Sequence, residues 1–345
     1  MAKAKQLPSG KWRTRVYSHT ETVNGKEKRI YESFTADTKK ESEFLAAKFA
    51  MDKNSVTKAN MTVEKAIQVY IDSKDKILSP ATIRAYRLNA KNHLEGIKHL
   101  PVDRLTSVLV QAEINNLVGK GLSPKTIRNI YGMLTAALKE AKPDIALKCL
   151  LPQKIKTDIS VPTGSELDRF IELADADMKI VIKLAAFMGL RRSEICALEW
   201  KDIDIKNKKL HINKALVLNN SNEYVLKGTK TTSSTRTLDI PNIILSDLER
   251  IERQGENVVS LTPLCITKRF RAITQKAKCQ GYRFHDLRHY YASVMLMLGI
   301  PDKYAMERMG HSTNNMLKTV YQHTFEQKQV EIANKLNDFF DRPTN

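Results

Sequence analysis

The stretch from His285 to His289 combines residue types that could act together on a phosphodiester. An imidazole, a carboxylate and a guanidinium follow one another closely, as His285, Asp286 and Arg288. Apolar residues continue beyond them at helical spacing, so we expect a buried helix with His285 and Arg288 on one face. Arginine binds two phosphate oxygens as a fork, and the downstream Tyr321 could supply an oxygen nucleophile. The stretch therefore predicts chemistry at a phosphate.

The same stretch also permits a metal site. His285 and His289 lie four residues apart beside Asp286, which superficially copies the zinc-binding pattern of helical metalloproteases. Asp286 is shorter than the glutamate of that pattern, and Arg288 would place a cation against the metal. No clear third ligand follows, with His311 left as a candidate. The zinc interpretation is the weaker alternative.

The composition favours a polyanionic partner. The chain holds 57 Lys and Arg against 38 Asp and Glu, which gives a formal net charge of +19 over 345 residues. A balance this basic is typical of proteins that bind nucleic acid, although a merely soluble basic protein would also have it. A chain of this length should form two or three domains.

Several classes of protein are not indicated. No apolar run approaches the roughly 20 residues that span a bilayer, and no signal peptide is evident. The four cysteines, Cys149, Cys196, Cys265 and Cys279, form no close pair, so neither a disulfide framework nor a zinc knuckle is predicted. We expect reduced cysteines in a cytoplasmic protein.

Residues 1–59 predict a small, basic αβ module. Lys11, Arg13 and Arg15 alternate with less polar residues, as in a strand with one basic face and one packing face. Asn24-Gly25 predicts a tight hairpin turn, and a capping sequence at Thr38 then predicts a helix. We interpret the basic face as a DNA contact, the alternative being a solvated face that touches nothing.

Residues 60–150 change to an all-helical pattern. Ser79-Pro80 and Ser123-Pro124 each place a capping serine before a proline at the first helical position. We expect a compact helical bundle that binds DNA. Its candidate DNA contacts are the basic residues on exposed helical faces, although a charged helical face is usually only solvated. They are Arg84, Arg87, Lys91, Lys125 and Arg128.

The remainder predicts a linker and a larger mixed domain. Prolines and few periodic apolar residues between Pro143 and Pro162 favour a connection, which we place at 151–162. Residues 163–345 then read as helices, an antiparallel sheet formed by 210–218, 224–230 and 235–240, and further helices. We expect an amphipathic terminal helix over 326–340 that docks on a neighbouring protomer, the alternative being that it covers the core of its own domain. The fold class is thus a multidomain, mainly α protein with small β-sheets.

Five separated elements, in this order, resemble the tyrosine recombinases, or phage integrase family, over residues 163–345. They are Gly189-Leu190-Arg191-Arg192-Ser193-Glu194, Thr229-Lys230-Thr231, His285-Asp286-Leu287-Arg288-His289, Met309-Gly310-His311 and Tyr321. The upstream modules resemble, through weaker motifs, the arm-binding and core-binding domains of integrases from phages and conjugative transposons.

The resemblance implies a catalytic role for each element. Tyr321 would be the nucleophile and form a 3′-phosphotyrosine, while Lys230 would protonate the departing 5′ oxygen. Lys227 remains open as the alternative lysine, because the register of the hairpin is unknown. The residues expected around the phosphate are Arg191, His285, Arg288 and His311. We expect Glu194 to be structural and to pair with a nearby basic group. The covalent intermediate would conserve the bond energy, so no metal, ATP or other cofactor is expected.

The implied function is site-specific integration or excision of a mobile element. The expected partners are double-stranded DNA at core and arm attachment sites and further copies of the chain in a homo-tetramer. The resemblance also allows for an excisionase or a host DNA-bending protein. A DNA-binding regulator without strand exchange stays open as the alternative. A type IB topoisomerase uses similar chemistry, but two modules ahead of a short catalytic core argue against it.

Overall fold

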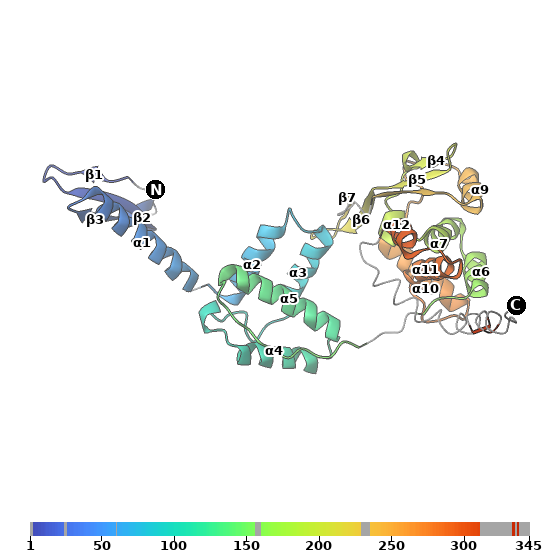
Figure 1. Cartoon of the computed structure of the whole chain (residues 1–345), viewed down its shortest axis with the longest axis horizontal. Coiled ribbons are helices and arrows are strands. Elements are labelled where there is room, and N and C mark those ends of the chain that lie inside the picture. The colour runs from blue at the N-terminus through green and yellow to red at the C-terminus, as the bar shows by residue number, and fades with distance from the viewer. Residues whose placement is uncertain are drawn as a thin grey trace, which may run out of the picture. The chain divides into compact units, whose positions relative to one another are not determined.

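The computed structural model describes residues 3–23, 26–59, 61–155, 160–228 and 235–310, together with Ala333, Asn334 and Asn337. The chain divides into two compact units, Met1–Ile155 and Lys156–Asn345 (Figure 1). Helices dominate both units, with small antiparallel sheets, which confirms the predicted fold class. None of the described helices is long and apolar enough to cross a membrane.

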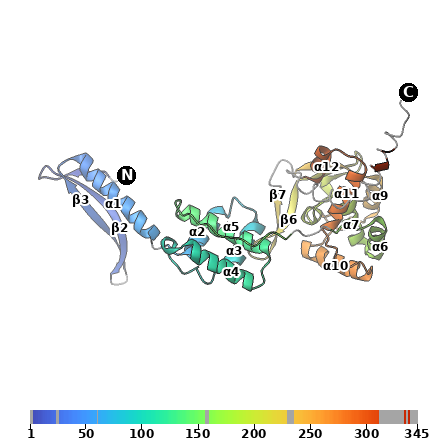
Figure 2. The ribbon, with the colours of Figure 1, turned by 60° about the horizontal axis from the view of Figure 1, so that its bottom comes forward.

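The first unit begins with an antiparallel sheet covered by one helix. Its strands are β1 (Lys5–Gln6), β2 (Trp12–Val23) and β3 (Lys26–Ala36), in the order β1-β2-β3. Val23 pairs with Lys26, so the hairpin turns where Asn-Gly predicted it. Helix α1 (Lys39–Ala59) packs along β2 and β3 (Figure 2).

The two faces of this sheet differ as the alternation predicts. Thr14 is fully buried and its hydroxyl lies 2.7 Å from that of Ser42 on α1. Phe34 of β3 packs against Phe49, with ring centroids 5.1 Å apart. The intervening Arg13 and Arg15 are exposed on the opposite face. A row of basic side chains therefore lies on the face that α1 leaves open.

Four helices form the predicted bundle in the rest of the first unit. They are α2 (Val63–Lys74), α3 (Pro80–Asn92), α4 (Ser107–Gly119) and α5 (Pro124–Ala141), with a short 3-10 turn η1 (Val102–Arg104) before α4. The hydroxyl of Ser123 caps α5 as expected, whereas Ser79 makes no side-chain cap bond. Isoleucines, valines and leucines from all four helices fill the core.

The stretch after α5 differs from the expected linker. It runs along the bundle and is fixed by side chains: Leu150 N–H donates to Gln111 Oε1 at 2.7 Å, and Arg128 Nη2 donates to the Pro152 carbonyl at 2.9 Å. Leu151 also packs against the core. The chain therefore stays attached to the helical bundle beyond residue 150, where we expected the linker to begin.

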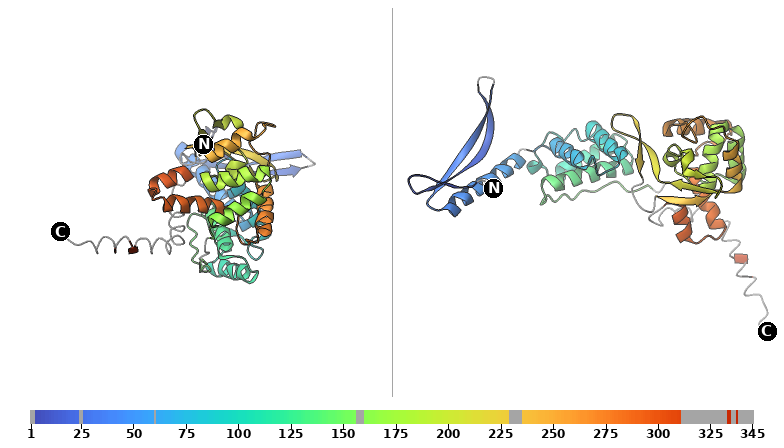
Figure 3. Two further views of the ribbon diagram at one scale, coloured as in Figure 1. Left: turned by 90° about the vertical axis from the view of Figure 1, so that its right-hand side faces the viewer. Right: turned by 90° about the horizontal axis from the view of Figure 1, so that it is seen from above.

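The second unit packs helices around α7, with small sheets at its edge. The helices are α6 (Gly164–Leu173), α7 (Ala176–Met188), α8 (Arg192–Ile195), α9 (Asn242–Arg250), α10 (Pro263–Lys276), α11 (Asp286–Met297) and α12 (Asp302–Met309), with a 3-10 turn η2 (Trp200–Asp202). Helix α7 buries apolar residues on several sides, as a central core helix does. Figure 3 shows this unit from two sides.

The predicted single sheet is two separate sheets. Strands β4 (Ile203–Asp204), β5 (Lys209–Ile212) and β8 (Arg236–Asp239) form one, and β6 (Lys214–Leu218) pairs only with β7 (Tyr224–Gly228) among the described strands. The expected strand 210–218 is thus interrupted. The break falls directly before Lys214, whose ammonium lies 2.8 Å from both Glu199 and Asp202.

Candidate active site

The site forms where four elements of the second unit meet. Arg191 is the N-cap residue of α8, shortly after the end of α7, and Arg288 lies in the first turn of α11. Both guanidinium groups reach the C-terminal end of α12. Arg191 Nη2 donates to the Gly310 carbonyl at 2.6 Å, and Arg288 Nη2 donates to the Met309 carbonyl. The structure thus brings together three of the five predicted elements.

Arg288 is buried, with 1% of its surface exposed. Its other terminal nitrogen donates to the carbonyl of Gly189, at the end of α7. Burial and the charge of Arg191 lower its pKa, while Glu194 opposes that shift. A guanidinium keeps its proton in proteins, so Arg288 acts as a fixed cation that ties α7, α11 and α12 together.

Gly189 permits the close approach on which this arrangement depends. Its φ of +68° lies in the left-handed region, and a Cβ added there would lie 2.5 Å from the ring of Tyr291. The hydroxyl of Tyr291 in turn accepts a hydrogen bond from Arg308 Nε of α12 at 2.8 Å. A glycine is therefore needed to end α7 against α11.

Glu194 is the acidic partner of this cluster and is 4% exposed. It accepts from the backbone N–H of Arg191 at 2.8 Å, from Arg191 Nη1 at 2.6 Å, and from both terminal nitrogens of Arg236 at 3.2 and 2.9 Å. Burial alone would raise the pKa of Glu194, but hydrogen bonds and charge from Arg236, together with Arg191, lower it to about 2. The expectation that Glu194 pairs with a basic group is confirmed.

Arg236 is the member of the site that sequence reasoning missed. It lies on β8, is 8% exposed, and donates through Nε to the Arg308 carbonyl at 2.8 Å. A signal was available, since Arg236 and Leu238 alternate with exposed residues and so share the buried face of the strand. An arginine on a buried face requires a partner, and Glu194 is that partner.

His285 lies at the edge of the cluster, immediately before α11. Its ring meets that of His289 edge-on, with centroids 5.0 Å apart. The side chain of His285 is exposed, yet neighbouring protein atoms displace part of its solvent and lower its pKa, and the charge of Arg288 lowers that pKa further. His285 is therefore predominantly neutral near pH 7. Among the described residues, no group of three potential metal ligands forms around the two histidines.

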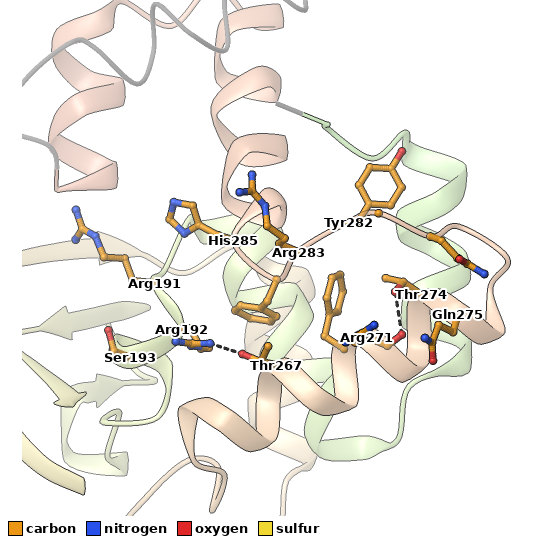
Figure 4. A pocket seen from close by; sticks show the side chains of 14 residues that line it. Arg191, Arg192, Ser193, Thr267, Arg271, Thr274, Gln275, Tyr282, Arg283 and His285 are labelled. Atoms are coloured by element: carbon orange, nitrogen blue, oxygen red, sulfur yellow. Dashed lines mark hydrogen bonds between the residues drawn. The ribbon is translucent and has the colours of Figure 1, made fainter. Parts of the chain in front are cut away.

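A basic cleft of about 730 Å³ opens beside Arg191 and His285. Arg192, Arg271 and Arg283 also line it, and none of the described residues that line it carries a carboxylate. Figure 4 shows Arg191 and His285 next to each other at one side, with Thr267, Arg271 and Gln275 along α10. A concave surface lined by cations without acids suits a polyanion.

Three predicted catalytic residues, Lys230, His311 and Tyr321, lie outside the described residues, as does most of the expected terminal helix. The alternative lysine, Lys227, lies on β7 and is half-buried. Gly310, which ends α12 in a left-handed conformation, directly precedes His311. The described part of the site thus ends at Gly310, the residue directly before His311.

The predicted DNA contacts of the first unit fall into two groups. Lys11, Arg13, Arg15, Lys91 and Lys125 are exposed, and Arg84 is half-buried. Arg87, in contrast, lies 3.3 Å from Asp72 and 3.6 Å from Asp75, and Arg128 donates to the Pro152 carbonyl. These last two side chains have roles within the bundle.

Comparison with known proteins identifies the second unit. Residues 163–328 match the model of the phage integrase family. A tyrosine recombinase XerC-like protein of Caldanaerobacter subterraneus is 25% identical, covering 94% of this chain and 96% of its own length. The ICEBs1 integrase of Bacillus subtilis is 23% identical, and the match covers 97% of this chain and 99% of the integrase.

Solved structures share the fold. The Tn1549 transposon integrase, in complex with transposon right end DNA, matches with a TM-score of 0.65 and 21% identity, over 79% of this chain and 99% of that one. A lambda integrase tetramer bound to a Holliday junction matches with a TM-score of 0.58 and 16% identity, over 92% of this chain and 94% of that one. The family match, together with the tyrosine recombinase and integrase among the relatives, places residues 163–328 in the phage integrase family.

Proposed function

We propose that the chain is a site-specific DNA recombinase that integrates or excises a mobile element by cutting and rejoining DNA strands. The observation that carries this proposal is the convergence of Arg191 and Arg288 on the end of α12, directly before His311. Two cations held at one point, beside a cleft lined by further arginines, suit the phosphate of a DNA backbone.

In the proposed reaction, the Tyr321 oxygen attacks a backbone phosphorus and the 5′ oxygen departs. The tyrosine proton leaves as the new O–P bond forms, and Lys230 gives a proton to the 5′ oxygen as the old bond breaks. The 3′ end then carries a phosphotyrosine. Attack by a 5′ hydroxyl of a partner strand reverses these steps and releases the tyrosine. One phosphoester replaces another at each step, so neither ATP nor a metal is required.

The arginines would stabilise charge on the non-bridging oxygens in the transition state. An arginine carries five N–H donors, and the bonds of Arg191 to the Glu194 side chain and to Gly310 use its two terminal nitrogens once each. Further donors can therefore bind a phosphate without breaking these contacts. His285, whose pKa is lowered, would be a neutral imidazole that donates a hydrogen bond to the phosphate.

The first unit would hold the DNA. We assign residues 1–59 to arm sites and the helical bundle, from residue 60 to about 150, to the core site, with 163–345 as the catalytic domain. The exposed Arg13 and Arg15 support the first assignment, and Lys91 and Lys125 support the second. By similarity to the lambda integrase tetramer, we propose a homo-tetramer on paired sites, with an excisionase or a host DNA-bending protein as accessory partner.

A nicked core site tests the proposal, because the short fragment released by cleavage diffuses away and traps the covalent complex. The wild-type chain is expected to give a protein–DNA adduct on a denaturing gel, with or without a chelator. Tyr321→Phe should bind the same DNA and give no adduct. Binding without any adduct in the wild-type chain would favour the DNA-binding regulator instead.

A bridging phosphorothiolate distinguishes the two candidate lysines, since a sulfur leaving group needs no proton. Lys230→Ala should cleave slowly at an ordinary phosphate and recover with sulfur at the 5′ bridging position. Lys227→Ala is the matched control and should resemble the wild-type chain on both substrates. Recovery of Lys227→Ala alone would assign the proton transfer to Lys227.

A further inference from the structure

Three successive carbonyls at the end of α12 each accept a hydrogen bond from a different arginine. The Arg308 carbonyl takes Arg236, the Met309 carbonyl takes Arg288, and the Gly310 carbonyl takes Arg191. Carbonyls at a helix C-terminus lack partners within the helix and carry a partial negative charge. These guanidinium groups satisfy both needs. The arginines thus fix the point from which the chain continues to His311.

Arg236 differs from the other two arginines because it holds the Glu194 carboxylate as a two-pronged fork. Its two terminal nitrogens contact both carboxylate oxygens, and its side chain is 4% exposed. Glu194 Oε1 is shared between Arg236 and Arg191 Nη1, while Oε2 is shared between Arg236 and the Arg191 backbone N–H. The carboxylate is therefore divided between two arginines.

This division determines what the guanidinium of Arg191 can do. A carboxylate prefers to hold one arginine as a two-pronged fork. With Arg236 in place, the side chain of Arg191 receives only one oxygen of Glu194, and its other terminal nitrogen reaches Gly310. Without Arg236, Glu194 could take both terminal nitrogens of Arg191 and turn them away from Gly310 and the cleft.

We propose that Arg236 is a positioning residue for catalysis. It shares the carboxylate of Glu194 with Arg191 and thereby orients the guanidinium of Arg191 toward the scissile phosphate. It also holds the Arg308 carbonyl, so it aligns the end of α12 with the same cluster. Arg236 itself touches no reacting atom in this scheme. The inference rests on the proposed function, since it assigns Arg191 to the phosphate.

The test compares Arg236→Ala and Arg236→Lys with the wild-type chain on a nicked site at saturating protein. Arg236→Lys keeps the charge but cannot bridge both oxygens of Glu194 and the Arg308 carbonyl at once. We expect DNA affinity to change by less than about twofold and adduct formation to slow by about tenfold to 100-fold, less than for removal of a direct oxyanion donor. Arg253→Ala is the control, because Arg253 stacks on Trp200 outside the site.

A second substrate distinguishes an effect on the orientation of Arg191 from a general folding defect. A methylphosphonate at the scissile position carries no charge on its non-bridging atoms, so it depends less on Arg191. If Arg236 orients Arg191, the loss of cleavage rate in both Arg236 variants should be at least about fivefold smaller on this substrate. The loss in Arg191→Ala should shrink to a similar extent. A general folding defect would slow both substrates equally and would overturn the proposal.

The remaining outcomes are also decisive. If Arg236→Ala does not fold, Arg236→Lys carries the test, and a wild-type cleavage rate in that variant would contradict the proposal. Absence of any adduct from the wild-type chain would instead contradict the proposed function. An adduct from the wild-type chain, with equal defects on both substrates in the variants, contradicts only the role of Arg236.

Discussion

Arginines occupy two contrasting environments in this chain. On the N-terminal sheet, Arg13 and Arg15 project from a face that α1 leaves open, and both are exposed. In the second unit, Arg236 and Arg288 are buried and Arg191 is partly buried, each bound to defined carbonyls or to Glu194. Exposed arginines adjust to a polyanion and are screened by salt. The buried ones are held by defined partners before any ligand binds, as the role that we propose for Arg191 and Arg288 requires.

The difference lies in what neutralises the charge. Water and salt ions screen the charges of the exposed face, whereas the buried cluster has, among the described residues, one carboxylate, Glu194, and the carbonyl end of α12. Three guanidinium groups against one carboxylate leave an excess of positive charge. A bound phosphate would offset that excess. The described part of the cluster is therefore preorganised to bind an anion such as a phosphate.

The largest expected effect is the removal of a fixed arginine. Arg191→Ala and Arg288→Ala should each lose roughly 3 kcal/mol or more of transition-state stabilisation, the scale of other oxyanion donors. Arg288→Ala should also lower the melting temperature, because the carbonyls of Gly189 and Met309 lose buried donors. Single-turnover cleavage and thermal unfolding measure the two effects. Wild-type cleavage by either variant would show that the pair is misassigned.

The next largest effect that we expect is a pH dependence of the free energy of unfolding, which Glu194 causes. Its pKa is lowered from 4.5 to about 2 in the folded protein, so the carboxylate stabilises the fold above pH 4.5 and loses that contribution as pH falls toward 2. The full contribution is roughly 3 kcal/mol, from 1.36 kcal/mol per pKa unit.

Glu194→Gln tests this expectation because it is nearly isosteric and uncharged. It should destabilise the second unit more at pH 7 than at pH 3, as measured by denaturant unfolding at each pH. Glu252→Gln, at an exposed position, is the control. An equal destabilisation at both values would mean that the charge of Glu194 does not contribute to stability.

The smallest effects are expected on the exposed sheet. Arg13→Ala or Arg15→Ala should weaken binding to arm-site DNA and reduce the slope of log affinity against log salt by about 0.9 for each phosphate that the variant no longer neutralises. Cleavage of a minimal core site should not change. An unchanged slope would indicate that this face is merely solvated.

Much of the fold follows from local patterns in the sequence. The alternation around Arg13 and the Asn-Gly turn predict the hairpin, and the capping serine at Ser123 predicts the start of α5. These features depend on neighbours along the chain. The same holds for Arg191 and Arg288, which lie in recognisable short motifs.

The features that sequence reasoning missed depend on distant partners. Arg87 reaches Asp72 and Asp75 on another part of the bundle, and Arg128 reaches Pro152, so neither is a simple exposed charge. Arg236 acquires its role only when β8 is placed beside α8 and α12. Such pairings require the tertiary structure, because no local periodicity encodes them.

The proposed function requires that this chain breaks DNA through a covalent bond to Tyr321, and mapping the DNA-linked peptide is the direct test. The adduct from a nicked site would be digested with trypsin and nuclease and analysed by mass spectrometry. We predict a nucleotide attached through its 3′ phosphate to the tryptic peptide 319–328, at Tyr321. A nucleotide on another residue, or an adduct that persists in Tyr321→Phe, would contradict the proposed function.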